Sequence, residues 1–274
     1  NEIKSFVEKF GEYKNPMLAI FDLVQSDSEH CRHHFFNGKL IRDNTLLNYS
    51  LFDLVKKTLK VKSKSNSLVA FNDNSSCIVG SECKGLCVDK EDMFKVNDLV
   101  YDYVLTAETH NFPSAIAPFE GGATGTGGRI RDVQATGIGA ITVAGSAGYS
   151  VGNIYINERD ESYPENIELP INILIGASNG ASDYGNKFGE PLIVGFTRNL
   201  SDIVDGRRRE WMKPIMFTSG IGLIDHRHIY KKEIEKDMLI AKIGGPAYKI
   251  GVGGGSSSSK EMDSKNAELD YNAV

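Results

Sequence analysis

One stretch of the sequence, residues 106–132, brings together side chains that could carry out phosphate chemistry. Glu108 and Asp132 could hold Mg²⁺ between phosphate oxygens, because Mg²⁺ prefers carboxylates and other oxygen ligands. Arg131 offers a planar guanidinium group suited to a phosphate or a carboxylate. His110 could transfer a proton or stabilise a developing charge. These residue types predict a site that binds a phosphorylated ligand together with Mg²⁺.

Glycines are concentrated in the same stretch, within residues 121–128. Because glycine lacks a Cβ, its backbone can approach a ligand closely. We expect a loop between Pro113 and Pro118, followed by a helix that opens at Gly127 or Gly128 and points its backbone N–H groups at one anion. The order of the glycines matches neither a P-loop nor the dinucleotide-binding fingerprint.

A structural interpretation of the same residues stays open. A segment that crosses close to another backbone would have the same glycine-rich composition. Arg131 and Asp132 would then form ordinary surface pairs, and His110 would be a loop histidine with satisfied hydrogen bonds. The residue types alone do not decide between the two interpretations.

The elements that hold this stretch follow from hydrophobic patterning. We expect a buried strand at residues 100–105 that presents residues 108–111 at its end, where α/β sheets often bind ligands. Asn15 and Pro16 carry the signals of a helix start, and apolar spacing predicts another helix at residues 46–59. Further strands are predicted at residues 139–144, 170–175, 192–196, 214–217 and 238–243. This order favours an α/β or α+β fold in which a mixed β-sheet packs against helices.

Composition argues against several functional classes. The chain of 274 residues has a net charge of −5 and a pI near 5.7, so we expect no nucleic-acid partner and no membrane partner. It has no apolar run of about 18 residues and no signal-peptide pattern. Four cysteines are too few for a disulfide scaffold and favour a cytoplasmic location. Cys83 and Cys87 form only half of a zinc pattern, so we do not expect zinc.

The segment "AETHNFPSAIAPFEGGATGTGGRIRDVQATG" resembles the phosphoribosylformylglycinamidine synthase family (FGAM synthase, FGAR amidotransferase) in its long single-chain form. Further segments resemble the family in the same order: "FDLVQSDSEHCRHHFFNGKL", "FNDNSS", "ASNGASDYGNKFGEP", "REWMKPIMFTSGIG" and "KIGGPAYKIGVGGGSSSS". The resemblance covers nearly the whole chain. It implies a helical lead-in at residues 1–66. It also implies an ATP-binding domain at residues 67–274, similar to the N-terminal domain of aminoimidazole ribonucleotide synthetase.

The resemblance implies an ATP-dependent carbon–nitrogen ligase of de novo purine biosynthesis. The family converts formylglycinamide ribonucleotide, ATP and glutamine to formylglycinamidine ribonucleotide, ADP, phosphate and glutamate. The substrate amide oxygen attacks the γ-phosphorus of ATP, while Mg²⁺ and backbone N–H groups offset the charge on the transferring group. Ammonia then displaces phosphate from the resulting iminophosphate.

Site residues follow from the resemblance, position by position. His30 and His110 match active-site histidines, and Glu108 and Asp132 match magnesium ligands. Substrate contacts are implied for Thr109, His110, Asn111, Phe112 and Arg131. The implied ATP-binding stretch consists of Gly122, Ala123, Thr124, Gly125, Thr126, Gly127, Gly128, Arg129, Ile130, Arg131, Asp132 and Val133.

The resemblance also implies parts of the enzyme that lie elsewhere. The family releases ammonia with an activated cysteine, and none of the four cysteines has such a context. The chain begins at Asn1, so we expect a piece of a longer protein. A second synthetase half and a glutaminase domain would complete it, unless the chain pairs with itself. At Thr106 and His33 the chain departs from the lysine and tyrosine of short-form relatives.

Two other functions stay open. The chain could be a nucleotide-binding or scaffold domain without turnover, whose sheet edge pairs with a homologous domain. It could also phosphorylate a different substrate with the same magnesium and phosphate chemistry. Asp183, Asn186 and Lys187 lie in a family-like segment, and their spacing assigns them no role. Residues 251–259 have the composition of a linker, but their resemblance to the family favours a structured turn near the site.

Overall fold

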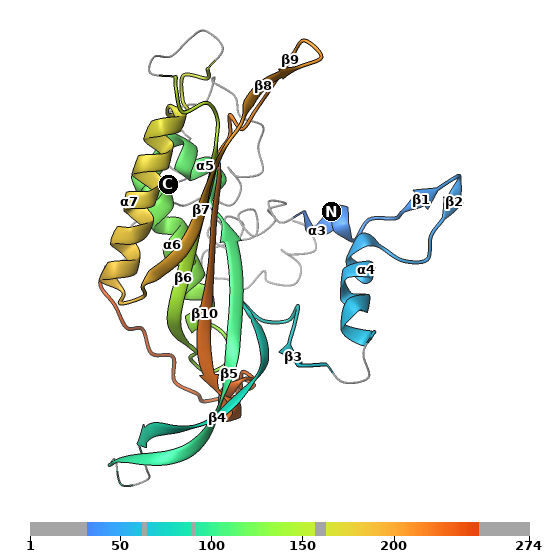
Figure 1. Cartoon of the computed structure of the whole chain (residues 1–274). Helices are drawn as coiled ribbons and strands as arrows, with labels where there is room; N and C mark the ends of the chain where they lie inside the picture. The colour runs from blue at the N-terminus through green and yellow to red at the C-terminus, as the bar shows by residue number, and fades with distance from the viewer. Residues whose placement is uncertain (1–31, 62–64, 89–90, 92, 157–162, 247–274) are drawn as a thin grey trace. The chain divides into compact units, whose positions relative to one another are not determined.

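The computed structural model describes residues 32–61, 65–88, 91, 93–156 and 163–246. Two compact units divide the chain, and their described parts are residues 32–61 and residues 65–246 (Figure 1). The domain boundary predicted between residues 66 and 67 stays a prediction. The helix predicted at Asn15, the histidine His30 and the run at residues 251–259 lie outside the described residues.

The smaller unit consists of short elements. They are α3 (His33–Phe36), β1 (Ile41–Arg42), β2 (Thr45–Leu46), α4 (Leu51–Lys57) and the 3₁₀ helix η1 (Thr58–Lys60). β1 and β2 pair antiparallel. Ser50 and Asp53 form a capping box, in which the Asp53 N–H donates to Ser50 Oγ at 3.1 Å. This cap explains why the helix predicted at residues 46–59 begins only at Leu51.

The larger unit is built on a six-stranded sheet. Its strands are β3 (Ser67–Val69), β4 (Ser76–Val88), β5 (Phe94–Thr109), β6 (Ile141–Val151), β7 (Leu192–Asn199) and β10 (Ile215–Asp225). Their order is β3-β4-β5-β10-β6-β7, and only β6 and β7 run parallel. A separate hairpin joins β8 (Ser201–Val204) to β9 (Arg207–Glu210). The predicted mixed sheet is confirmed.

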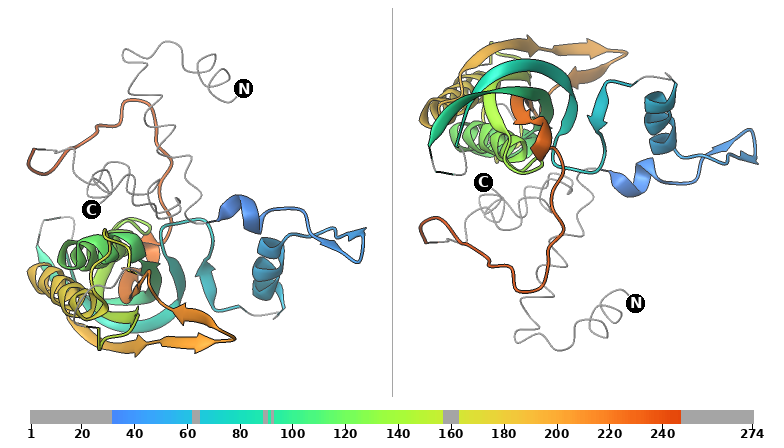
Figure 2. Two further views of the ribbon diagram at one scale, coloured as in Figure 1. Left: turned by 90° about the horizontal axis from the view of Figure 1, so that it is seen from above. Right: turned by 90° about the horizontal axis from the view of Figure 1, so that it is seen from below.

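Three helices cover one face of this sheet. They are α5 (Asn111–Ile116), α6 (Pro118–Gln134) and α7 (Pro170–Lys187). Figure 2 shows α6 and α7 side by side within the curve of the sheet. Val133 of α6 packs with Val104 and Ile224 of the sheet in one buried cluster, and Ala177 of α7 packs with Tyr149 in another. The core therefore lies between the helix layer and the sheet, and both contribute side chains to it.

The opposite face of the sheet stays open among the described residues. Tyr103 and Leu105 alternate along β5 with the buried Asp102 and Val104, so they point away from the helices. These two side chains are exposed, as are Ile221 of β10 and Ile141 of β6. A contiguous row of exposed apolar side chains is typical of a surface that another protein segment covers.

Two of the predicted strands are wrong. Residues 170–175 form the first turns of α7, because Pro170 occupies the first helical position and the pattern continues at helical spacing to Lys187. Residues 238–243 form no strand, and Leu239 and Ile240 are almost fully exposed. No strand of the described residues pairs with that segment, so its β-forming composition finds no partner.

Candidate functional site

The glycine-rich segment does not have the local structure that the sequence predicts. α5 begins at Asn111, directly after His110, so the loop expected between Pro113 and Pro118 is mostly helix. Pro118 occupies the first position of α6 and opens that helix. Gly127 and Gly128 lie well inside α6, where backbone N–H groups bond within the helix. The prediction that one of them starts a helix at an anion site is therefore wrong.

The glycines of α6 instead allow close packing of helices. A Cβ added to Gly122 would lie 2.2 Å from the Ala177 carbonyl oxygen of α7, and one added to Gly180 of α7 would lie 1.8 Å from the Phe119 carbonyl oxygen. Gly121 is equally close to the backbone of Ser114 in α5. Crossing of nearby backbones, the structural interpretation of these glycines, thus accounts for several of them. Gly128 differs, because an added Cβ would meet only the Arg131 side chain, at 3.8 Å.

Glu108 and Asp132 come together as the sequence predicts. Glu108 lies at the end of β5 on the face that α6 covers, and Asp132 lies in the last turns of α6. Loss of surrounding water and the adjacent Asp132 carboxylate raise the pKa of Glu108, although Arg131 partly offsets this. Two adjacent carboxylates form a donor set that suits a divalent cation.

Asp132 is held by two neighbouring side chains. Its Oδ1 accepts hydrogen bonds from Nε and Nη2 of Arg131, at 3.3 and 3.2 Å, and from Asn74 Nδ2 at 3.4 Å. Asp132 itself is buried, whereas the Arg131 side chain is 72% exposed. The guanidinium group of Arg131 is therefore accessible to an anionic ligand.

Asn74 is a site residue to which sequence reasoning gave no role. It lies in the "FNDNSS" segment, which the resemblance to the family had singled out without assigning its residues. Its amide oxygen accepts from Lys231 Nζ at 3.2 Å. Lys231 also forms an ion pair with Asp73. No local signal marks Lys231, because its partners lie more than 150 residues away along the chain, at separations of 158 and 157.

His110 has a fixed orientation between β5 and α6. Its Nδ1 lies 2.7 Å from the carbonyl oxygen of Gly121, which can only accept, so Nδ1 carries the proton. Burial lowers the pKa of His110, although the hydrogen bond to Gly121 opposes this effect. The histidine is therefore neutral near pH 7, and its Nε2 carries a lone pair that can accept a proton.

The other predicted substrate-binding residues have different environments. Thr109 is exposed at the end of β5. The side-chain oxygen of Asn111 accepts a hydrogen bond from the Met216 N–H at 3.1 Å, and Phe112 is buried at 4% exposure. Asn111 and Phe112 thus tie α5 to its surroundings, and their contact with a substrate stays a prediction.

Arg129, a member of the predicted ATP-binding stretch, is committed to a structural ion pair. Its side chain and that of Glu190 are both fully buried, and Nη1 donates to Glu190 Oε1 at 2.6 Å. Its Nε donates to Thr218 Oγ1 at 2.9 Å. The guanidinium group of Arg129 is therefore not accessible to a nucleotide.

Several lesser candidates have ordinary surroundings. Asp183 and Lys187 form an exposed ion pair at 2.6 Å along α7. Cys77, Cys83 and Cys87 are free thiols. Within the part of the chain that the structure describes, no cluster of three or more histidine, cysteine or acidic residues could hold a metal ion. Among these same residues, no helix has the length and apolar character required to cross a membrane.

The chain is similar over most of its length to one segment of larger proteins. It is 50% identical over 273 residues to phosphoribosylformylglycinamidine synthase of Dictyostelium discoideum, covering 95% of this chain and 20% of that protein. It is 46% identical over 287 residues to the human protein of the same name, covering all of this chain and 21% of that protein. The chain thus spans about a fifth of the length of these curated relatives.

Solved structures give a weaker likeness. A structure described as T. maritima PurL complexed with FGAR is 21% identical, with a TM-score of 0.48, over 94% of this chain and 32% of that one. Another, T. maritima PurL complexed with ATP, is 19% identical with a TM-score of 0.43, over 83% of this chain and 27% of that one. No protein-family model matches the chain.

Proposed function

Because the chain is a homologue of one segment of the phosphoribosylformylglycinamidine synthases, we propose that it forms part of the synthetase site of such an enzyme. The whole enzyme would convert formylglycinamide ribonucleotide, ATP and ammonia from glutamine to formylglycinamidine ribonucleotide, ADP and phosphate. The observation that carries this proposal is the adjacency of the Glu108 and Asp132 carboxylates beside the exposed guanidinium group of Arg131.

The two carboxylates have the chemistry to hold Mg²⁺. Carboxylate oxygens are suitable ligands, and Mg²⁺ commonly takes one or two of them together with phosphate oxygens and water. When bound, the cation would neutralise charge on the transferring phosphoryl group. The raised pKa of Glu108 is consistent with this assignment, because a cation would offset both the loss of surrounding water and the repulsion from Asp132 that raise it. Arg131 would pair with a phosphate of either nucleotide.

His110 would accept or transfer a proton at the substrate amide. Its Nδ1–H donates to the Gly121 carbonyl, which leaves Nε2 as the atom that can accept a proton. Burial keeps the ring neutral near pH 7, as this role requires. The role of His30 rests on its match to the family alone.

Partners would complete the site. The exposed apolar row of Tyr103, Leu105, Ile221 and Ile141 supports docking of another domain, either the second synthetase half of the same enzyme or a second copy of this chain. The glutaminase domain that supplies ammonia would also lie elsewhere in the whole protein. We further propose a cytoplasmic location, on the grounds of the sparse cysteines.

Release of ADP tests the proposal. The chain would be assayed alone and together with the remaining segments of the enzyme, with Mg-ATP, formylglycinamide ribonucleotide and ammonium chloride, and with each component omitted in turn. We expect release only when all are present. Glu108→Gln should abolish it, while Glu120→Gln, a change at an exposed acid of α6, should not. Nucleotide binding without ADP release in the complete assembly would favour the scaffold alternative instead.

A further inference from the structure

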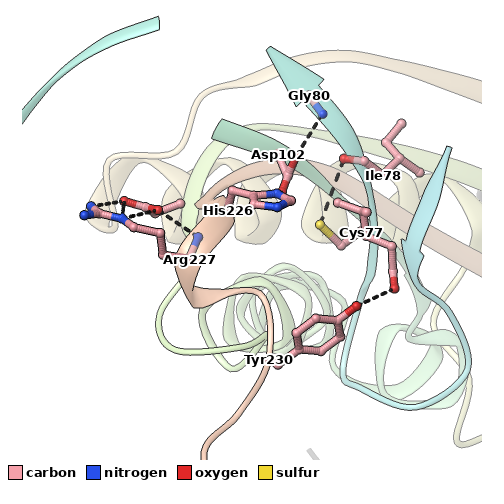
Figure 3. Close-up of polar contacts among 9 residues, drawn as sticks. Cys77, Ile78, Gly80, Asp102, His226, Arg227 and Tyr230 are labelled. Carbon is pink, nitrogen blue, oxygen red and sulfur yellow. Dashed lines mark hydrogen bonds and ion pairs between the residues drawn. The ribbon is translucent and has the colours of Figure 1, made fainter. Parts of the chain in front are cut away.

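The segment after β10 lies between the sheet and the loop that precedes β4. It runs from Asp225, the last residue of β10, through the 3₁₀ helix η2 (His226–His228) to Lys231, and we call residues 225–231 the strap. Figure 3 shows how its first part is anchored: His226 Nδ1 lies 2.6 Å from Oδ2 of the fully buried Asp102, whose Oδ1 accepts from the Gly80 N–H at 3.0 Å. The start of the strap is therefore fixed to the interior of the sheet.

The middle of the strap has three further anchors. The His228 carbonyl oxygen accepts from the Ile138 N–H at 2.9 Å, just beyond α6. The Tyr230 hydroxyl donates to the Leu68 carbonyl oxygen at 3.4 Å (Figure 3). Ile229 packs in the buried cluster that contains Val104. These anchors hold the backbone next to Lys231 in place. The position from which the Lys231 side chain extends is therefore fixed.

Lys231 meets two residues of the loop before β4. Its Nζ forms an ion pair with Asp73 and donates to Asn74 Oδ1 at 3.2 Å. Asp73 in turn accepts from the Gly137 N–H at 3.0 Å. Burial alone would raise the pKa of Asp73, but hydrogen bonds from Lys231, Gly137 and Asn74 lower it overall, so the carboxylate is charged near pH 7.

These contacts determine which way the Asn74 amide faces. An ammonium group can only donate, so it selects the amide oxygen of Asn74. The amide nitrogen then points the other way, where it donates to Asp132 Oδ1 at 3.4 Å. Arg131 donates to the same oxygen. Among the described residues, the N–H groups that bond to the Asp132 carboxylate therefore all meet Oδ1, and Oδ2 is the oxygen without an N–H donor.

We propose that Lys231, acting through Asn74, is a positioning residue that orients the Asp132 carboxylate for the divalent cation of the site. This inference rests on the proposed function, because it assumes that Glu108 and Asp132 bind the cation. Residues that orient a metal ligand commonly change metal affinity about 10- to 100-fold when they are replaced. Lys231 would belong to this class, although it touches neither the cation nor the nucleotide.

Binding of Mn²⁺, measured by electron paramagnetic resonance on the chain, tests the inference. We expect Lys231→Met to weaken Mn²⁺ binding about 10-fold. The direction of the change in Mn²⁺ affinity is informative, because Lys231 is itself a cation. If Lys231 acted only through its charge, its removal would strengthen Mn²⁺ binding. Lys231→Arg should retain most of the affinity, since it can still donate to the amide oxygen. Lys236→Met, at another exposed lysine, is the matched control.

A double-mutant cycle separates positioning from a general loss of stability. Asn74→Ala should weaken Mn²⁺ binding about as much as Lys231→Met, and the double variant should be no weaker than Asn74→Ala alone, because the lysine acts through the asparagine. The inference would be overturned if the two substitutions reduced Mn²⁺ affinity additively, or if Lys231→Met left that affinity unchanged. Neither result would argue against a cation site at Glu108 and Asp132. If the unaltered chain, assembled with the remaining segments of the enzyme, binds no Mn²⁺, the proposed function itself fails.

Discussion

Arg129 and Arg131 lie two residues apart on α6, yet they occupy opposite environments. The side chains of Arg129 and its partner Glu190 are both 0% exposed. The side chain of Arg131 is 72% exposed, and that of its partner Asp132 is 9% exposed. Two steps along a helix rotate a side chain by about 200°, so one arginine points into the core and the other points away from it.

This difference separates two uses of the same residue type. An ion pair buried on both sides is withdrawn from ligands, and its role is to join α6 to the strand layer. A pair whose arginine is exposed and whose acid is buried keeps one charged group available for binding. The sequence places both arginines in one predicted ATP-binding stretch, and only their burial tells them apart.

The largest effect expected from this comparison is on stability. Arg129→Met should lower the free energy of unfolding by about 3–5 kcal/mol, because it leaves the charge of Glu190 buried and unpaired. Arg131→Met should change it by less than about 1 kcal/mol, since exposed pairs contribute little. Urea unfolding followed by circular dichroism measures both.

If Arg129→Met does not fold, the double variant Arg129→Met/Glu190→Met provides the measurement. Removal of both charges should recover much of the lost stability, because an apolar pair can replace a buried ion pair. Equal destabilisation by the Arg129 and Arg131 substitutions would show that burial does not distinguish the two arginines.

The sequence predicts those features of the fold and of the candidate site that depend on residues near one another along the chain. A short β-forming apolar run located the strand at residues 100–105, and the residue types of Glu108 and Asp132 in one glycine-rich stretch suggested one site. The burial of Arg129 could not be predicted, since Glu190 is 61 residues away and the space for the guanidinium group exists only because Gly145 and Gly220 lack side chains. In the same way, Asn74 reaches Asp132 across 58 residues.

A smaller effect should distinguish the glycines that pack from the one that does not. Gly180→Ala should destabilise the fold by about 1–3 kcal/mol, because the new Cβ would overlap the Phe119 carbonyl oxygen of α6. Gly128→Ala should instead stabilise it by about 0.5–1 kcal/mol, because alanine favours the helix and the added Cβ has room. Thermal unfolding of the two variants measures the contrast.

The affinity of the Gly128→Ala variant for ATP tests whether Gly128, unlike the glycines that pack, serves ligand binding. If Gly128 serves ligand approach, as the ATP-binding assignment predicts, the variant should be more stable and yet bind ATP more weakly in the assembled enzyme. Unchanged ATP affinity would remove Gly128 from the predicted ATP-binding residues and leave the helix glycines with packing roles alone.

A still smaller effect concerns the charge pair at the site. The raised pKa of Glu108 means that the folded state binds its proton more tightly than the unfolded state does. Stability is therefore lost as pH rises from the ordinary pKa of a glutamic acid through the higher pKa of Glu108 in the folded state. Over this range the free energy of unfolding of Glu108→Gln should exceed that of the unaltered chain by on the order of 0.5 kcal/mol. The difference is small because Glu108 is exposed and water screens its charge.

Addition of Mg²⁺ should remove that advantage. The cation would stabilise the unaltered chain and leave Glu108→Gln unaffected, because only the former has both carboxylates. Melting temperatures of both proteins at pH 4.5 and pH 7, with and without Mg²⁺, measure this effect. The stability of Glu108→Gln minus that of the unaltered chain should be larger at pH 7 than at pH 4.5. A smaller difference at pH 7 would contradict the repulsion between Glu108 and Asp132.

The smallest effect is expected at Asp183 and Lys187, an ion pair in which both side chains are accessible to solvent. Their ion pair spans one turn of α7 with the acid on the N-terminal side, a geometry that contributes about 0.3–0.5 kcal/mol. Lys187→Ala should therefore lower stability only within that range, and the loss should shrink at high salt. Because both residues lie in a family-like segment, turnover of the assembled enzyme decides their role. A large loss of turnover without loss of stability would place Lys187 with Arg131 as a ligand-binding cation, whereas normal turnover would leave it a helix-surface pair.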